Sequence, residues 1–242
     1  MRTYEEENMY SFDSRIRYSE TDSEGRLSLE ALLDYFQDCS TFQSEDLGLG
    51  IEYLKEMHLV WVLASWQIVV DKYPKLGEQV NVGTFPYDFK TCFGYRNFFM
   101  KDQDGQFLAK ANSLWTLLDT RTMHPVRPPE MMREKYSLEE RLDMDYASRK
   151  IMMPEHMLSM EPLEVRRHHL DTNHHVNNGQ YVRIAAGYLP EGFEVTLLRT
   201  EYRKQAVLQN KLYPWVSLGW EKCVVALRDE QGNAYANIEF VR

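Results

Sequence analysis

The chain has 242 residues, of which 43% are hydrophobic and 13% aromatic, enough apolar surface for one large domain or two smaller ones. No stretch approaches the ~18 apolar residues that a bilayer-spanning helix needs, so we expect no stable membrane insertion. The formal net charge of −9, with no long basic run, argues against nucleic acid as a partner.

The front half predicts one strand, one helix and four further strands. Residues 12–18 have a strand pattern, residues 22–25 have a turn composition, and Ser28 is a suitable N-cap for a helix that runs toward residue 46. Strand patterns then occupy residues 60–71, 79–87, 93–101 and 106–118. Because helices do not alternate with these strands, a curled antiparallel sheet is favoured over a parallel one.

The back half repeats this order. Residues 163–169 have a strand pattern, a polar turn follows, and a shorter helix begins near Asn178. The openings of the two halves align at an offset of 149 residues, with Asp22 on Asp171. This shared order indicates an internal duplication. The remaining strand patterns occupy residues 194–204, 212–221, 223–229 and 234–242.

Residues 121–162 differ in composition from both halves. They hold five of the nine prolines and eight of the twelve methionines, with a charged helical pattern at residues 130–142. We interpret residues 121–162 as a connector between an N-terminal domain, residues 1–120, and a C-terminal domain, residues 163–242. The methionines are expected to fill space along the outside of the sheet, with lipid contact as the alternative.

The N-terminus and the cysteines bear on the location of the protein. Residues 1–10 are acidic and lack an apolar core, so we expect neither a secretory signal nor a transit peptide. The cysteines, Cys39, Cys92 and Cys223, are far apart and odd in number, which is typical of a reducing compartment. A cytoplasmic protein is therefore predicted.

The negative net charge still allows an acidic protein partner, which would bind a local basic patch. Solvated strand faces are the commoner explanation for clustered basic residues. Two groups are candidates for the patch: Arg166 with Arg167, and Arg199 with Arg203 and Lys204.

The most informative stretch is residues 171–181, where an acid, several amides, two histidines and a tyrosine occur together. The apolar spacing that begins at Tyr181 predicts a helix directly after the cluster. A helix start offers free backbone N–H groups and the positive end of the helix dipole to developing negative charge. Asp171 and His175 add groups that can move protons or polarise water. The cluster is therefore a candidate catalytic site.

Landmark motifs occur in order along nearly the whole chain. The C-terminal signature is Asp-x-Asn-x-His-Val-Asn-Asn at residues 171–178, followed by Tyr181 and by Glu-Tyr-Arg at residues 201–203. Together with the front-half landmarks, these motifs resemble those of the acyl-[acyl carrier protein] thioesterases of bacteria and plants. The front-half landmarks are residues 17–22, Trp61, residues 74–78, Arg96, residues 102–105, Trp115, Asp119 and residues 127–129.

The resemblance implies an α+β fold of two tandem hot-dog domains, each a curved antiparallel sheet wrapped around a central helix. It implies hydrolysis of the thioester between a fatty acyl chain and the phosphopantetheine arm of acyl carrier protein, which releases free fatty acid and ends fatty acid synthesis. No cofactor and no metal are expected, and a homodimer is one option for assembly. The alternatives are an acyl-CoA thioesterase of the same fold and a non-catalytic acyl-binding module.

The resemblance also implies the site residues. We expect Asp171, Asn173 and His175 to be catalytic. Asp171 would activate water or orient the group that does so, His175 would transfer a proton, and Asn173 would polarise the thioester carbonyl or hold the water. Glu201 is a reserve base, and Gln205 is an auxiliary residue that would hold a water.

The chain departs from the plant members at one place. Plant members carry Glu-Cys shortly after the Glu-Tyr-Arg motif, and this chain has Gln205 and Ala206 there. A cysteine nucleophile at this position is therefore excluded, and we interpret Cys223 as a core thiol.

The front copy of the motif is altered as well. Gly25 and Arg26 stand where His174 and His175 would fall, so the sequence predicts one active site per chain, in the back half. The front domain is then expected to help form the wall of an apolar tunnel for the acyl chain. We expect His174, Asn177 and Asn178 to be structural and Tyr181 to be in the core.

Overall fold

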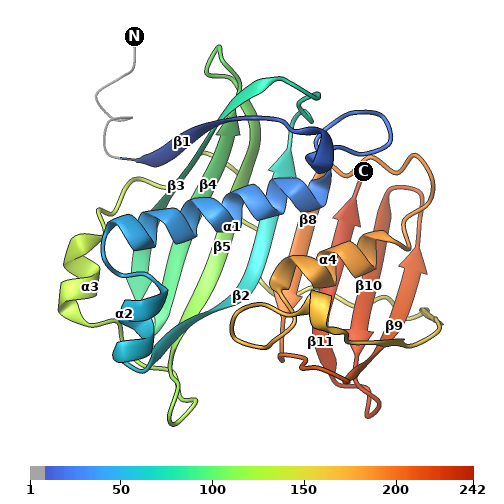
Figure 1. Cartoon of the computed structure of the whole chain (residues 1–242). Helices are drawn as coiled ribbons and strands as arrows, with labels where there is room; N and C mark the ends of the chain where they lie inside the picture. Colours follow the sequence, from blue (N-terminus) through green and yellow to red (C-terminus); the bar gives the residue numbers. More distant parts are fainter. Residues whose placement is uncertain (1–8) are drawn as a thin grey trace. The chain divides into compact units, whose positions relative to one another are not determined.

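The structure is a computed structural model that describes residues 9–242 (Figure 1). Most of the acidic N-terminal segment, for which no targeting signal is predicted, lies outside the described residues. The chain divides into two compact units, Met1–Leu63 with Val70–Tyr146 and Ala64–Val69 with Ala147–Arg242. The segment predicted as a connector is thus divided between the units. Within residues 9–242, no helix has both the length and the apolar composition to cross a membrane.

The first unit is built on an antiparallel sheet and one long helix. Helix α1 (Leu29–Asp46) packs on strands β1 and β3 and buries its leucines, Phe36 and Cys39. Its N-cap is Ser28, as predicted, whose hydroxyl accepts the Ala31 N–H at 3.2 Å. Short helices α2 (Ile51–Glu56) and α3 (Glu130–Lys135) complete the unit. The strands pair in the order β1 (Tyr10–Arg15), β3 (Gln79–Lys90), β4 (Phe93–Lys101) and β5 (Phe107–Asp119).

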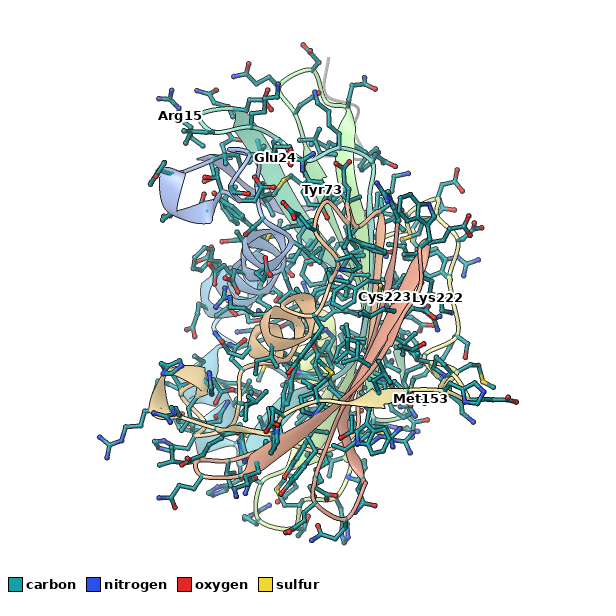
Figure 2. All side chains as sticks on the ribbon, turned by 90° about the vertical axis from the view of Figure 1, so that its right-hand side faces the viewer. Arg15, Glu24, Tyr73, Met153, Lys222 and Cys223 are labelled. Carbon is teal, nitrogen blue, oxygen red and sulfur yellow. The ribbon has the colours of Figure 1, made fainter. Side chains whose placement is uncertain are left out.

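The second unit repeats this plan with a shorter helix. Helix α4 (Asn178–Ala186) packs on β10 and β11. Residues 65–69 of β2 (Leu59–Val70) pair with β8, and the short β7 (Leu163–Glu164) pairs with β9. Figure 2 shows α4 on one side of these strands and Met153 of the predicted connector on the other. The strand order from β8 is β8 (Leu197–Tyr202), β11 (Ala234–Val241), β10 (Lys222–Arg228), β9 (Lys211–Leu218) and β6 (Leu158–Ser159).

Two sequence predictions were wrong in detail. The helix predicted over residues 130–142 ends at Lys135, because the chain beyond it bonds to the sheet instead: the Leu142 N–H donates to the buried Asn97 Oδ1 at 3.1 Å. The strand predicted over residues 163–169 stops at Glu164. Residues Arg167–His169 form a 3₁₀ turn, in which His169 Nδ1 accepts the Arg166 N–H at 3.0 Å.

The internal duplication is confirmed at the level of single hydrogen bonds. The 3₁₀ turns η1 (Tyr18–Glu20) and η2 (Arg167–His169) lie 149 residues apart, and so do the starts of α1 and α4. After each 3₁₀ turn comes the same short hairpin turn, closed by a bridge between Thr21 and Leu27 in one unit and between Leu170 and Val176 in the other. Each unit therefore presents the same backbone frame in front of its helix.

Candidate active site

Asp171 holds the turn that begins the predicted site. Its Oδ1 accepts the backbone N–H groups of Asn173 at 2.8 Å and His175 at 3.2 Å, while its own N–H donates to the His175 carbonyl at 2.8 Å. This is the hydrogen bonding by which Asp residues build turns. Asp22 and Asp102 make the same pattern elsewhere in the chain, and Asp229 shares its bonds with the residue four positions on. One of the two carboxylate oxygens of Asp171 is thus used to hold the turn.

His174 occupies the left-handed position of this turn. Its φ is 62°, and the equivalent Gly25 in the front copy has a φ of 74°. The side chain of His174 is exposed, and its backbone N–H donates to the Asp171 carbonyl at 3.1 Å. Its position agrees with the structural role predicted for it.

His175 is partly buried, and its Nδ1 atom is fully enclosed without a hydrogen-bond partner among residues 9–242. A buried polar atom without a partner is costly, and such atoms are concentrated at functional positions. Asn173 is exposed, and the part of the chain that the structure describes supplies no hydrogen bond to its side-chain amide. The turn therefore combines an imidazole that has an enclosed, unpartnered nitrogen with an exposed amide that can bind a substrate or a water.

A second segment lies directly beside this turn. The Val176 N–H donates to the Ala206 carbonyl at 2.9 Å, and His175 forms a β-bridge with Val207. The Ala206 N–H donates to the Tyr181 hydroxyl at 2.9 Å, and both residues are buried. Gln205, which is exposed, is therefore close in sequence to the residues that contact the turn. The structure brings the predicted auxiliary residue to the same region as Asp171, Asn173 and His175.

Glu201 lies elsewhere. Successive side chains of a strand point to opposite faces, and on β8 the Tyr202 hydroxyl donates to the carbonyl of Asn178 at the start of α4. Glu201 therefore points to the other face, where its carboxylate accepts from Arg203 at 2.8 Å and Asn237 at 3.2 Å. Burial raises the pKa of Glu201, but these hydrogen bonds and one from the Ile151 N–H together lower it. The structure does not bring Glu201 together with the turn.

The helix that follows the turn is held as predicted. Asn177 is the N-cap of α4, and its Oδ1 accepts the Gly179 N–H at 2.8 Å. Asn178 is the first helical residue, and Tyr181 is only 2% exposed. The predictions of capping for Asn177 and of core burial for Tyr181 are confirmed. The hydrogen bond by which the Tyr181 hydroxyl accepts the Ala206 N–H was not predicted from the sequence.

The front copy keeps the hydrogen bonds of the turn but lacks the histidine. Asp22 Oδ1 accepts the Glu24 and Arg26 N–H groups at 2.9 Å, as Asp171 does in the back copy. Its other oxygen lies 3.5 Å from the guanidinium of Arg26, which replaces His175. The segment beside this turn, residues 74–78, shares most of its backbone bonds with residues 206–210. An alignment of residues 206–210 with residues 74–78 was therefore the sequence signal that could have placed residues 206–210 at the site.

The first unit contains an apolar cavity of about 150 Å³ beneath α1. Arg96 lies in its wall, is 8% exposed, and donates to Gln43 and, at 3.1 Å, to Thr84. Burial lowers the pKa of Arg96. The cavity is therefore mostly apolar but has one buried cation in its wall. Its other lining residues include Ser40, Thr41, Ser44, Leu54, Trp61, Phe89, Trp115 and Tyr136.

The three cysteines of the chain are free thiols. Cys39 and Cys223 are buried and Cys92 is partly buried, and none of the three forms a disulfide. Among residues 9–242, no group of three or more His, Cys, Asp or Glu residues is placed to hold a metal ion. Cys223 lies on β10 in the core, in agreement with its interpretation as a core thiol.

Curated relatives of this chain are plant enzymes. It is 27% identical over 225 residues to the palmitoyl-acyl carrier protein thioesterase of Gossypium hirsutum, a match that covers 84% of this chain and 54% of the relative. It is 24% identical to the oleoyl-acyl carrier protein thioesterase 1 of Arabidopsis thaliana, over 78% of this chain and 58% of the relative. The chain thus spans about half the length of the curated relatives it matches.

Solved structures confirm the fold. The crystal structure of an acyl-ACP thioesterase from Bacteroides thetaiotaomicron superposes with a TM-score of 0.89 at 21% identity, covering 99% of both chains. The 12:0-ACP thioesterase from Umbellularia californica superposes with a TM-score of 0.81 at 20% identity, covering 96% of both chains. These likenesses, with a helix against an antiparallel sheet in each unit, confirm the predicted α+β tandem hot-dog fold.

Family profiles match most of the chain. Residues 7–136 match the acyl-ACP thioesterase N-terminal domain, and residues 153–221 match the acyl-ACP thioesterase C-terminal domain. The first match alone covers more than half of the 242 residues. The chain therefore belongs to the acyl-ACP thioesterase family.

Proposed function

We propose that this protein hydrolyses the thioester of fatty acyl-[acyl carrier protein] and releases the free fatty acid, so that it ends fatty acid synthesis. The observation that carries the proposal is the enclosed Nδ1 of His175, which lacks a partner among residues 9–242 in the turn that carries the family signature. A cytoplasmic location accompanies the proposal and is supported by the three unpaired cysteines.

The reaction needs a base, an activated water and a group that stabilises the oxyanion. His175 removes a proton from a water as the water oxygen attacks the thioester carbonyl carbon, and it returns the proton to the sulfur as the C–S bond breaks. The amide of Asn173 donates to the carbonyl oxygen as negative charge develops there. Asp171 holds the turn through Oδ1, and its other carboxylate oxygen orients the attacking water. Gln205, which precedes Ala206 in the segment that bonds to the turn, holds the water.

The apolar cavity of the first unit suits the hydrocarbon end of the acyl chain. Its aromatic residues, Trp61, Phe89 and Trp115, supply the apolar surface that a hydrocarbon needs. The hydroxyls of Ser40 and Thr41 are bonded to the Gln37 carbonyl of their own helix, so they do not require a polar ligand. We therefore assign acyl-chain binding to the N-terminal domain and hydrolysis to the C-terminal domain.

The equivalent turn in the front copy supplies the control for the test. His175→Ala is expected to lower kcat/KM for acyl-carrier hydrolysis by at least ~10²-fold, the usual worth of a general base. Asp171→Asn is expected to lower kcat strongly, whereas Asp22→Asn, in the same turn of the front copy, leaves it unchanged. An Asn oxygen can accept the same two N–H bonds, so both Asn variants are expected to keep the melting temperature of the parent.

Wild-type turnover by folded His175→Ala and Asp171→Asn would overturn the site assignment. Equal activity losses in Asp171→Asn and Asp22→Asn would reduce the role of Asp171 to the turn alone. Comparing one acyl chain on carrier protein and on CoA separates the proposal from an acyl-CoA thioesterase, which would prefer the CoA ester. Acyl binding without turnover would identify a non-catalytic binding module.

A further inference from the structure

The two 3₁₀ turns that precede the hairpin turns share a backbone and differ in charge. In the front copy, residues 17–20 contain Arg17 and Glu20, whose side chains pair at 3.3 Å, so the charge is neutralised locally. In the back copy, residues 166–169 are Arg-Arg-His-His, with no acid. Of these two turns, both within residues 9–242, only the one in the copy that carries His175 therefore has basic side chains without an acidic partner.

Arg166, Arg167 and His168 are exposed, and within the described part of the chain no ion pair neutralises either arginine. Burial lowers the pKa of His169, and the charges of His168 and Arg166 lower it further; its Nδ1 accepts the Arg166 N–H. The permanent cations of this turn are the two arginines. Two unpaired guanidinium groups are notable in a chain of net charge −9.

The other predicted basic patch is already neutralised. Arg199 pairs with Glu239 at 2.6 Å and also donates to the carbonyl of Ser148. Lys204 pairs with Asp229 at 2.5 Å. Arg203, the third member, pairs with Glu201 at 2.8 Å. Because these three basic residues are paired with acids of the same chain, the pair Arg166 and Arg167 is the better candidate for the basic patch.

An apolar pair lies next to the arginines. Val207 and Leu208 are 42% and 40% exposed. They are close to the 3₁₀ turn because the Val165 N–H donates to the Asn210 carbonyl at 2.8 Å, and the Gln209 N–H donates to the Val165 carbonyl at 3.0 Å. They are close to the site because Val207 bridges to His175.

The acid nearest in sequence, Glu164, lies opposite Lys211 in the β7–β9 register. The exposed surface beside His175 thus combines two guanidinium groups with two aliphatic side chains. Such a surface fits a protein face that presents carboxylates around an apolar centre.

We propose that Arg166, Arg167, Val207 and Leu208, here called the carrier surface, dock the acyl carrier protein through an acidic face of that protein. The proposal rests on the proposed function, because it names the surface that delivers the thioester to His175. The guanidinium groups steer the carrier and hold it by charge, and Val207 and Leu208 supply the apolar contact at the centre. The phosphate of the pantetheine arm is a second anion that could meet these arginines, and the test below separates the two.

The main variant is Arg166→Glu with Arg167→Glu, and the matched control is Arg17→Glu at the equivalent position of the front copy. Hydrolysis of dodecanoyl-carrier protein, dodecanoyl-phosphopantetheine and dodecanoyl-pantetheine is measured at low and high ionic strength. We expect the main variant to lose roughly 10–100-fold in kcat/KM on the carrier substrate at low ionic strength, and less at high. The two small substrates, which lack the carrier, should change less than twofold. Leu208→Asp should reproduce the loss on the carrier, and Arg17→Glu should change none of the substrates.

An equal loss on phosphopantetheine and carrier substrates would assign the arginines to the phosphate and overturn the proposal. A loss on pantetheine would indicate damage to the site, and wild-type kinetics on the carrier would also overturn it. Binding of holo-carrier protein, followed by fluorescence anisotropy, makes the result independent of turnover. Carrier binding that the main variant weakens, in a protein without hydrolysis, would keep the docking surface and refute the proposed function instead.

Discussion

The hydroxyl of Tyr181 gives the sharpest test of how the site is held in place. It accepts the Ala206 N–H at 2.9 Å, and both residues are almost fully buried, at 2% and 0% exposure. The neighbouring Ala206 carbonyl accepts the Val176 N–H, and Val207 bridges to His175. One phenol oxygen therefore fixes the segment that lies beside the proposed base.

Tyr181→Phe removes this acceptor and leaves the ring in place. The buried Ala206 N–H then has no partner, and an unsatisfied buried donor costs about 1–3 kcal/mol. We expect the free energy of unfolding to fall by about that amount in urea titrations. We also expect kcat to fall roughly tenfold, because the segment that carries Gln205 loses one of its anchors to the turn.

Tyr202→Phe is the matched control. Its hydroxyl donates to the Asn178 carbonyl at 3.0 Å on the same face of the sheet, and a carbonyl at a helix start can take another partner more easily than a buried N–H can. The control should lose about 1 kcal/mol or less and keep its kcat. If both variants lost the same stability, or if Tyr181→Phe kept full kcat, the anchoring argument would be refuted.

Three further predictions concern Glu201, His174 and Ser40. Glu201→Gln should keep kcat, since Glu201 points away from α4; a loss above ~10²-fold would restore it as a base. The folded pKa of Glu201 is lowered, so its stabilisation is present above the unfolded pKa of about 4.3 and is lost as pH falls through the folded value. The stability difference from Glu201→Gln in chemical denaturation should therefore be largest near neutral pH and vanish in acid; a constant difference would contradict this. His174→Gly should keep activity and leave the melting temperature unchanged or raise it, since glycine adopts the 62° φ without strain; loss of turnover would give the His174 side chain a role. Ser40→Leu should fill the cavity and shift the kcat/KM ratio of short over long acyl chains upward by roughly tenfold; an unchanged chain-length profile would place the acyl chain elsewhere.

Much of the fold follows from the alternation of apolar residues. The strand predicted at residues 93–101 has the bounds of β4, and the predicted start of the back-half helix is Asn178, the first residue of α4. The helix predicted to residue 142 failed because helical propensity is a weak local preference. In the folded chain, the buried amide of Asn97 binds the Leu142 N–H and the Tyr146 hydroxyl, and these long-range bonds decide the path.

The site was predictable only in part. The signature at residues 171–178 located the turn, because the turn needs particular residue types at fixed spacing. The face on which Glu201 lies depends on the register of β8 against its neighbours, which a single sequence does not contain. Whether Arg199 is neutralised depends on the same register, which places Glu239 opposite it. Partners that meet across a sheet are set by the assembled fold.

The Asp-held turn has a wider consequence, since the chain uses it at Asp22, Asp102, Asp171 and Asp229. At all four places the carboxylate accepts the N–H four residues on, whether or not the turn lies at the proposed site. In the proposed site, reactivity depends on the acid together with the residues two and four positions later, Asn173 and His175. The front copy, with Glu24 and Arg26 at those positions, keeps the same turn without the reactive side chains. A second reactive centre could be engineered there by changing side chains on a backbone that is already folded for it.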